Sequence, residues 1–290
     1  MEFFVFAEPL RYKKAPLLLS PFSMKVFLSS RLAALLLAGV SSLHAVEIIA
    51  HRGASFDAPE NTVASFKLGW EQNADADELD IYLSQDNQIV VLHDKNTKRI
   101  TGVNKAVVQQ TLAELRAQDA GSWKDPRWTG EKLPTLAEAL ATMPDGKRFF
   151  IEIKCGPEIL PELERVLKVS GKKSEQLVII GFDYETMRQA RIQFPELAIY
   201  WLASYSINKS TGELPTLDDL LVKTKAAKLT GLNLDFHFPI DGSFVNKVKA
   251  GGLKLYTWTV DDPVVAKTLA AAGVDGITTN RPAWLREQLK

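Results

Sequence analysis

Two histidines and two acidic residues stand at or near the ends of apolar runs in the first third of the chain. His51 and His93 each follow a short apolar run, and Glu78 and Asp80 lie in a third run between them. Residues i and i+2 of a β-strand point to the same face, so the two carboxylates are expected to lie side by side. Two neighbouring carboxylates repel each other, and a bound cation would remove that repulsion. The pattern predicts an acid/base pair of histidines around a cation site.

A second pair at the same spacing, Glu152 and Lys154, follows another apolar run. Buried charges are costly unless they are paired or bound to metal, so we expect Glu78, Asp80 and Glu152 to hold the cation. Lys154 and Arg52, which follows the first histidine, are then left to bind an anionic group such as a phosphate. The alternative for both basic residues is an ion pair with the carboxylates.

Oxygen ligands favour a hard cation, so the predicted cofactor is Ca²⁺ or Mg²⁺ rather than Zn²⁺. The alternative has His51 or His93 as further ligands, which would favour Zn²⁺ or a two-metal site. The sequence contains no His-x-Glu or His-x-His cluster to support that alternative.

Short β-branched runs alternate with amphipathic stretches from residue 46 onward. The predicted strands are 46–50, 78–83, 148–154, 176–181, 198–203, 231–235, 253–260 and 276–279, with 88–93 as a hairpin partner of the second. The predicted helices are 61–72, 135–141, 159–169, 184–193, 216–225, 242–250, 263–272 and 281–289. Eight βα units of this total length match an α/β fold of the (β/α)8 TIM barrel type.

The segment 94–147 is too long for a plain connection and predicts a small insertion after the second strand, with a short helix at 112–118. A doubly wound sheet is the competing fold, but it would want a glycine-rich phosphate loop after the first strand, and His51-Arg52-Gly53-Ala54 is not such a loop. In a barrel the active site lies at the carboxyl ends of the strands, where all the candidate residues fall.

The first 45 residues predict a leader rather than part of the fold. A signal peptide beginning at Met24 has Lys25 and Arg31 ahead of the apolar run 32–40, and cleavage is expected near Ala45. That run is shorter than the ~20 residues that span a bilayer, so we expect no stable membrane anchor. The domains are then 1–45, the leader, and 46–290, the barrel, in a periplasmic or secreted protein.

The charge balance and the cysteine content bear on two further features, a nucleic-acid partner and a disulfide. The chain has 35 basic and 35 acidic residues, so nucleic acid is not an expected partner. The single cysteine, Cys155, allows no intramolecular disulfide. The oligomeric state stays open.

Several short motifs occur together in one order along the chain. They are His51-Arg52-Gly53, Pro59-Glu60-Asn61-Thr62, Glu78-Leu79-Asp80, His93-Asp94, Glu152-Ile153-Lys154, Tyr256-Thr257-Trp258-Thr259-Val260 and Gly273-Val274-Asp275-Gly276-Ile277. On these motifs the chain resembles the glycerophosphodiester phosphodiesterase family. The resemblance implies a small-molecule substrate, a glycerophosphodiester, which is hydrolysed to glycerol 3-phosphate and an alcohol. It also implies that the insertion caps the barrel mouth.

The mechanism expected from these residues is metal-dependent acid–base catalysis. One histidine removes a proton from the nucleophile, and the other protonates the leaving alkoxide. The sequence leaves open which histidine does which, and whether water or the neighbouring glycerol hydroxyl attacks. Trp258 shares a strand face with Tyr256 and is expected to line the pocket near the alcohol, with core packing as the alternative.

Three positions depart from the pattern of the family. The resemblance would put Asn where Asp261 stands, Asp where Asn280 stands, and often Ser where Gly181 stands. None of the three is expected to touch the histidines or the carboxylates. Asn61 is expected to fix the loop after the first strand rather than to react.

Two other functions compete with this interpretation. The first is a lipid-directed phosphodiesterase on the same barrel, resembling the phosphatidylinositol phospholipases or sphingomyelinase D. The second is a non-catalytic phosphodiester-binding barrel, whose mark would be the loss of a histidine or a carboxylate. Neither kind of residue is lost here.

Overall fold

The computed structural model describes residues 46–207, 209 and 212–290 of the chain. The predicted leader, 1–45, lies outside the described residues, and so does its predicted cleavage near Ala45. None of the described helices is both long and apolar enough to cross a bilayer.

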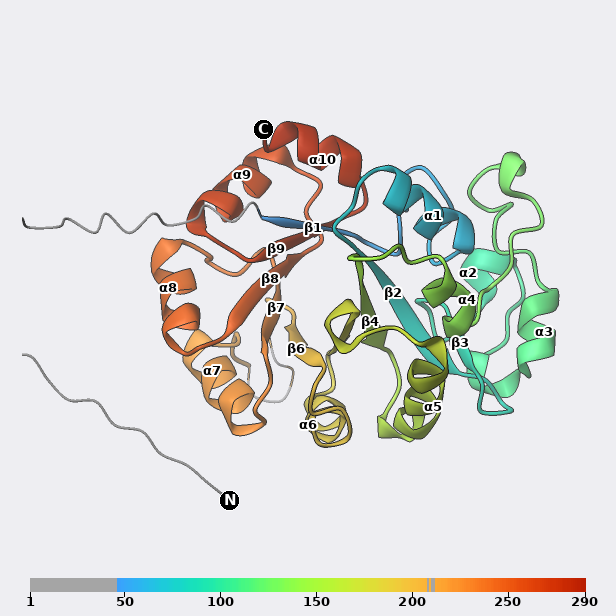
Figure 1. The fold of residues 1–290 in the computed structure, drawn as a ribbon, viewed down its shortest axis with the longest axis horizontal. Coiled ribbons are helices and arrows are strands. Elements are labelled where there is room, and N and C mark those ends of the chain that lie inside the picture. Colours follow the sequence, from blue (N-terminus) through green and yellow to red (C-terminus); the bar gives the residue numbers. More distant parts are fainter. Residues whose placement is uncertain (1–45, 208, 210–211) are drawn as a thin grey trace, which may run out of the picture. The chain divides into compact units, whose positions relative to one another are not determined.

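Eight parallel strands of the described chain form a closed barrel, which confirms the predicted fold class (Figure 1). They are β1 (Glu47–Ala50), β2 (Ala76–Leu83), β4 (Arg148–Ile153), β5 (Leu177–Gly181), β6 (Ala198–Ala203), β7 (Gly231–Asp235), β8 (Lys254–Trp258) and β9 (Gly276–Thr279). β1 closes the barrel because it pairs in parallel with β9 on one side and with β2 on the other.

A layer of helices surrounds these strands, as Figure 1 shows. It consists of α1 (Val63–Glu71), α4 (Leu136–Ala141), α5 (Leu160–Ser170), α6 (Tyr184–Gln193), α7 (Leu217–Ala226), α8 (Gly242–Ala250), α9 (Pro263–Ala272) and α10 (Pro282–Gln288). Side-chain caps explain where helices begin: Thr62 and Ser65 form a capping box at α1, and Asp262 accepts hydrogen bonds from the first turn of α9.

The insertion between β2 and β4 packs around a small apolar core of its own. It contains β3 (Ile89–Val91), α2 (Lys98–Thr101), α3 (Leu112–Ala117), and the 3₁₀ turns η1 (Val107–Gln109) and η2 (Pro126–Trp128). Two further 3₁₀ turns, η3 (Pro157–Ile159) and η4 (Ser174–Gln176), flank α5. β3 pairs with β2 as the predicted hairpin. The apolar core contains Val90, Leu92, Ile100 and Leu115. The one-turn helix α2 was not predicted.

Alternation along the strands divides the apolar side chains between two layers. On β4, Phe149 and Ile151 pack outward among the helix-facing residues, whereas Phe150 packs inside the barrel against Tyr200 and Tyr256. Because side chains two apart share a face, Glu152 points into the barrel as Phe150 does. The backbone pattern of one strand thus decides that an acidic side chain enters the interior.

β2 begins earlier than the sequence predicted. Ala76 and Asp77, which lie outside the predicted strand 78–83, pair with Arg148 and Phe149 of β4. Pairing to β4 on one side and to β1 on the other satisfies the backbone of these two residues.

Candidate active site

Three carboxylates from two adjacent strands converge inside the barrel, near its carboxyl end. Asp80 of β2 is the direct neighbour of Glu152 on β4, and Glu78 lies two residues earlier on the same face of β2. One oxygen of each lies within 4.8 Å of the others, and all three side chains are buried. The parallel pairing of β2 with β4 therefore assembles the acidic cluster predicted from the sequence.

Nothing within the acidic cluster balances the negative charges of its three carboxylates. Among the described residues, Glu78 Oε1 and Asp80 Oδ1 accept no hydrogen bond. Burial, with Asp80 and Glu152 nearby, raises the pKa of Glu78. Burial and the Asp80 charge raise the pKa of Glu152 to about 7. Buried oxygens that repel each other and have vacant lone pairs fit a hard divalent cation, so this cluster can hold one.

The loop between β1 and α1 holds the cluster from one side. The backbone N–H of Arg52 donates to Glu78 Oε2 at 3.0 Å. Asn61 Nδ2 donates to Asp80 Oδ2 at 2.8 Å, and Asn61 Oδ1 accepts from the Asp80 backbone N–H at 3.2 Å. Arg52 and Asn61 have φ values of 58° and 60°, so the loop turns sharply where it meets the carboxylates. Asn61 fixes the loop against β2, as the sequence analysis expected.

Arg52 and Lys154 both make ion pairs with the acidic cluster. Arg52 Nε lies 3.3 Å from Asp80 Oδ2, while Lys154 Nζ lies 2.7 Å from Glu152 Oε1 and 3.5 Å from Asp80 Oδ1. Although burial alone would raise the pKa of Asp80, these two cations hold it below its usual value. Both side chains also line the pocket, so they can reach an anion there.

His93 is supported by a chain of charged groups that the sequence analysis did not assemble. Its Nδ1 lies 2.7 Å from Asp94 Oδ1, and Arg99 Nε donates to Asp94 Oδ2 at 2.7 Å. Arg99 also binds Glu60, which in turn accepts from Arg52 Nη1 at 2.8 Å. The insertion therefore contributes a residue, Arg99, that orients the second histidine through Asp94.

His51 is supported by a neutral group instead. Its Nδ1 lies 2.7 Å from Oδ1 of Asn280, the residue that directly follows β9. This contact corrects the expectation that Asn280 does not touch a histidine. Asp261 is linked to the ring through Asn280, whose Nδ2 donates to Asp261 Oδ2. The physical reason is the pairing of β1 with β9, which places the residues that follow the two strands side by side.

Both histidines favour the neutral ring in this setting. Burial and the charge of Arg52 lower the pKa of His51 to about 4. Burial lowers the pKa of His93, against the opposing charge of Asp80. A neutral imidazole can accept a proton near pH 7, as a general base must.

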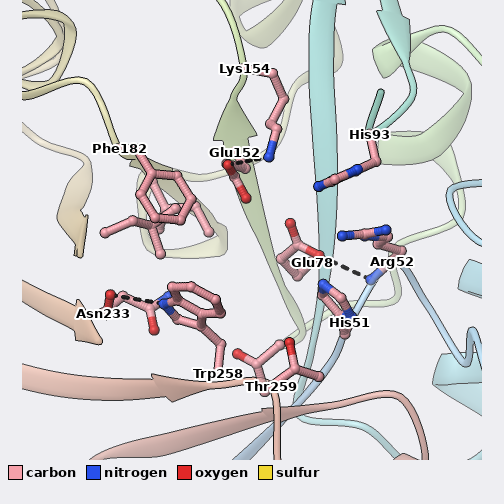
Figure 2. Close-up of a pocket in the computed structure, with 13 residues that line it drawn as sticks. His51, Arg52, Glu78, His93, Glu152, Lys154, Phe182, Asn233, Trp258 and Thr259 are labelled. Atoms are coloured by element: carbon pink, nitrogen blue, oxygen red, sulfur yellow. Dashed lines mark hydrogen bonds and ion pairs between the residues drawn. The ribbon is translucent and has the colours of Figure 1, made fainter. Parts of the chain in front are cut away.

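All of the predicted site residues except Asp80 line one pocket. Its lining consists of His51, Arg52, Glu78, His93, Glu152, Lys154, Ile180, Phe182, Leu202, Asn233, Trp258, Thr259 and Thr278. Figure 2 shows the two histidines with Arg52 and Glu78 on one side, and Phe182 with Trp258 on the other. The pocket therefore has a charged wall for an anion and an aromatic wall for the rest of a ligand.

Trp258 is fixed at this aromatic wall. Its indole Nε1 donates to the backbone oxygen of Asn233 at 3.0 Å, and its ring meets Phe182 edge to face with centroids 5.5 Å apart. Tyr256, two residues earlier on the same strand, lies deeper among the barrel side chains. Trp258 is thus a pocket residue, while Tyr256 is a core residue.

The sequence model of the glycerophosphoryl diester phosphodiesterase family matches residues 51–284, which include every residue of the site just described. The chain belongs to this family. Membership confirms the resemblance found on the motifs and the predicted enzyme class, a phosphoric diester hydrolase.

Relatives within the phosphodiesterase family cover most of the chain. A glycerophosphodiester phosphodiesterase of Caldanaerobacter subterraneus is 34% identical over 243 residues, which are 82% of this chain and 95% of that protein. Another, from Bacillus subtilis, is 29% identical and covers 81% of this chain and 83% of its own. A phosphodiesterase of Oleispira antarctica, solved in complex with the product sn-glycerol-3-phosphate, is 29% identical with a TM-score of 0.75, covering 84% and 96% of the two chains.

Three supporting residues of the site were missed by the sequence analysis. Asp94 directly follows His93, and that adjacency was a usable signal. Asn280 directly follows β9, as His51 directly follows β1, so its position at a strand end was also a usable signal. Arg99 carried no signal, because its position depends on how the insertion folds.

Proposed function

We propose that this protein is a metal-dependent glycerophosphodiester phosphodiesterase that releases glycerol 3-phosphate and an alcohol. The observation that carries the proposal is the meeting of two histidines, two cations and two carboxylates in one pocket, with the third buried carboxylate, Asp80, beside them. The name and bound product of the relatives support the substrate class. The aromatic wall opposite the charged groups gives the uncharged part of such a substrate a place to lie.

Glu78, Asp80 and Glu152 would hold the cation, which is Ca²⁺ or Mg²⁺ by the chemistry of its oxygen ligands. When bound, a divalent cation neutralises phosphate oxygens and lowers the pKa of a hydroxyl beside it. Arg52 and Lys154 add positive charge from the protein and would hold the phosphate in place. Phe182 and Trp258 form the apolar wall on the far side of the pocket.

His51 and His93 form the proposed acid/base pair. One ring takes the proton of the attacking hydroxyl, and the other gives a proton to the oxygen of the departing alcohol. Replacement of either histidine by alanine is expected to lower kcat by about 10² to 10⁴ while the protein still folds. Near-normal turnover in a correctly folded variant would remove that histidine from the mechanism.

We favour the neighbouring 2-hydroxyl of the glycerol as the nucleophile. Its oxygen attacks phosphorus and the bond to the alcohol breaks, so that a cyclic phosphate forms; water then opens the ring to glycerol 3-phosphate. A hydroxyl already tethered beside phosphorus gains from effective molarity, which free water lacks. A substrate with hydrogen in place of this hydroxyl should bind comparably and be cleaved far more slowly. Equal rates would support direct attack by water.

The main experiment measures glycerol 3-phosphate released from glycerophosphocholine before and after treatment with EDTA. We expect activity to be lost with the metal and to return with added Ca²⁺ or Mg²⁺. Full activity in protein shown to be metal-free would overturn the metal assignment. Faster cleavage of intact phosphatidylcholine than of glycerophosphocholine would favour a lipid-directed enzyme instead.

Export to the periplasm or the medium is also a proposal, supported by the leader pattern between Met24 and Ala45. N-terminal sequencing of the mature protein is expected to find a chain that begins near Val46. An intact N-terminus at Met24 in cytosolic protein would contradict it.

A further inference from the structure

Asn280 and Asp261 form a hydrogen-bonded chain that ends on His51. We propose that Asn280, itself held by Asp261, is a positioning residue that fixes the ring orientation and the tautomer of His51. The inference rests on the proposed acid/base role of His51. It adds two residues that follow the last two strands, β8 and β9, to the proposed mechanism.

The direction of the Asn280 amide follows from its partner. Asp261 accepts three hydrogen bonds, from Asn280 Nδ2 at 2.5 Å, from the Asn280 backbone N–H at 2.9 Å and from Thr279 Oγ1 at 2.7 Å. A carboxylate can only accept hydrogen bonds. The amide nitrogen of Asn280 must therefore face Asp261, and its oxygen must face the other way.

The direction of the amide then determines the tautomer of His51. Asn280 Oδ1 lies 2.7 Å from His51 Nδ1 and also accepts from Ser55 Oγ at 2.9 Å. An amide oxygen has no hydrogen to donate, so the hydrogen between it and the ring must belong to Nδ1. The neutral ring then carries its lone pair on Nε2, the nitrogen that is free to exchange a proton with a substrate.

The backbone makes this arrangement rigid. The His51 backbone N–H donates to the Thr279 backbone oxygen at 2.8 Å, one residue before Asn280. Asp261 follows β8, so three adjacent strand ends, those of β8, β9 and β1, place the three side chains. The ring cannot turn away without losing a contact to a fixed neighbour.

The other charged groups that face His51 come from the loop after β1 and from β2. They are Arg52 and Glu60 of the loop and Asp80 of β2. None of these changes when the residues at 261 and 280 are altered. A change in the behaviour of His51 can therefore be assigned to the chain from Asp261.

The experiment combines kinetics with long-range ¹H–¹⁵N NMR of the four histidine rings of the full chain, which reports each tautomer. Asn280→Ala should lower kcat about 10-fold or more with little change in KM. It should also remove the Nδ1–H signature of His51.

The double variant Asp261→Asn/Asn280→Asp exchanges the two side chains at constant net charge. It should keep the tautomer and raise the pKa of His51 by about 1 unit or more, because a carboxylate then faces the ring. The limb of the kcat–pH profile that depends on His51 should shift in the same direction as the pKa of His51.

Asp262→Asn is the matched control, because it removes a charge one residue away while an asparagine can still cap α9. It should leave the His51 tautomer and the pH profile unchanged. The proposal is overturned if Asn280→Ala keeps the wild-type tautomer and kcat, or if the exchange leaves the His51 titration unmoved. The NMR readout needs no turnover, so it separates a failure of this proposal from a failure of the proposed function.

Discussion

Two clusters of charged side chains lie inside the barrel, one toward each end, and they are built in opposite ways. At the start of the strands, Glu47 faces Arg148, whose Nε donates to Oε1 at 3.0 Å, and Tyr256 Oη donates to Glu47 Oε2 at 3.0 Å. One acid meets one base there, and each carboxylate oxygen is engaged. At the mouth, three carboxylates face two cations, and buried oxygens are left without hydrogen bonds among the described residues.

The difference separates a cluster that supports the fold from one that is arranged to bind a ligand. A satisfied ion pair leaves nothing for a ligand to add, whereas repelling carboxylates are stabilised only when something binds them. A charge inside the barrel therefore does not by itself mark a functional site, whereas several like charges that converge on one pocket without enough partners do.

The largest expected effect comes from removing a carboxylate at the mouth. Glu78→Gln should lower kcat about 100-fold or more, because the proposed cation loses one of its three carboxylate ligands and with it the charge that neutralises the phosphate. In EDTA the same variant should unfold at a higher temperature than the wild type, because one of three repelling charges is gone. Activity assays and thermal melts in EDTA check the two halves, with Glu162→Gln, which lies outside the pocket, as control. A lower melting temperature would mean that the two clusters are alike.

The opposite change is expected at the other end of the barrel. Arg148→Met leaves the Glu47 carboxylate without its cation and should cost about 1–3 kcal/mol of unfolding free energy. The folded variant should keep its kcat, since neither residue lines the pocket. Urea unfolding measures the loss, and Arg165→Met, in a surface pair with Glu162, should change stability by less than about 0.5 kcal/mol. A drop in kcat without loss of stability would contradict the comparison.

The smallest effect concerns Asp77, which points out of the barrel between the two clusters. It is fully buried, and neither of its oxygens has a partner in the part of the chain that the structure describes. Burial raises the pKa of Asp77 well above its usual value. Its folded pKa then exceeds its unfolded pKa, so its contribution to stability falls as pH rises from the unfolded value, near 4, through the folded value.

Asp77→Val should therefore stabilise the protein at pH 8, by about 1 kcal/mol, and by less at pH 5. Unfolding of both proteins in urea at the two pH values measures this. A gain that is equal at the two pH values would show that packing against α1, rather than ionisation, is what the substitution changes.

The sequence was sufficient for the barrel and for the acidic cluster, because both follow from local patterns. The alternation in β2 and β4 places Glu78, Asp80 and Glu152 on one face, and parallel pairing brings the strands together. Every predicted strand limit lies within two residues of the observed one. At β2 the difference arises because Ala76 and Asp77, outside the predicted strand, pair with both neighbouring strands.

The support of the two histidines could not be predicted in the same way. The contact between His51 and Asn280 joins residues 229 positions apart and exists only because the barrel closes. The link from Arg99 to Asp94 depends on the path of the insertion, where α2 is a single turn with no periodic pattern. Residues that position another side chain are therefore harder to predict from a sequence than residues that bind a ligand directly.

The closure of the barrel by β1 and β9 also bears on the order in which the molecule becomes active. The acidic cluster comes from β2 and β4, which are closer together along the chain than β1 and β9 are. The support of His51 needs the first strand to meet the last. Contacts between distant parts of a chain carry a larger loop-closure entropy and form later on average. We therefore expect a refolding chain to regain its cation-binding cluster before its catalytic histidine is aligned, so that turnover reports the final step of folding.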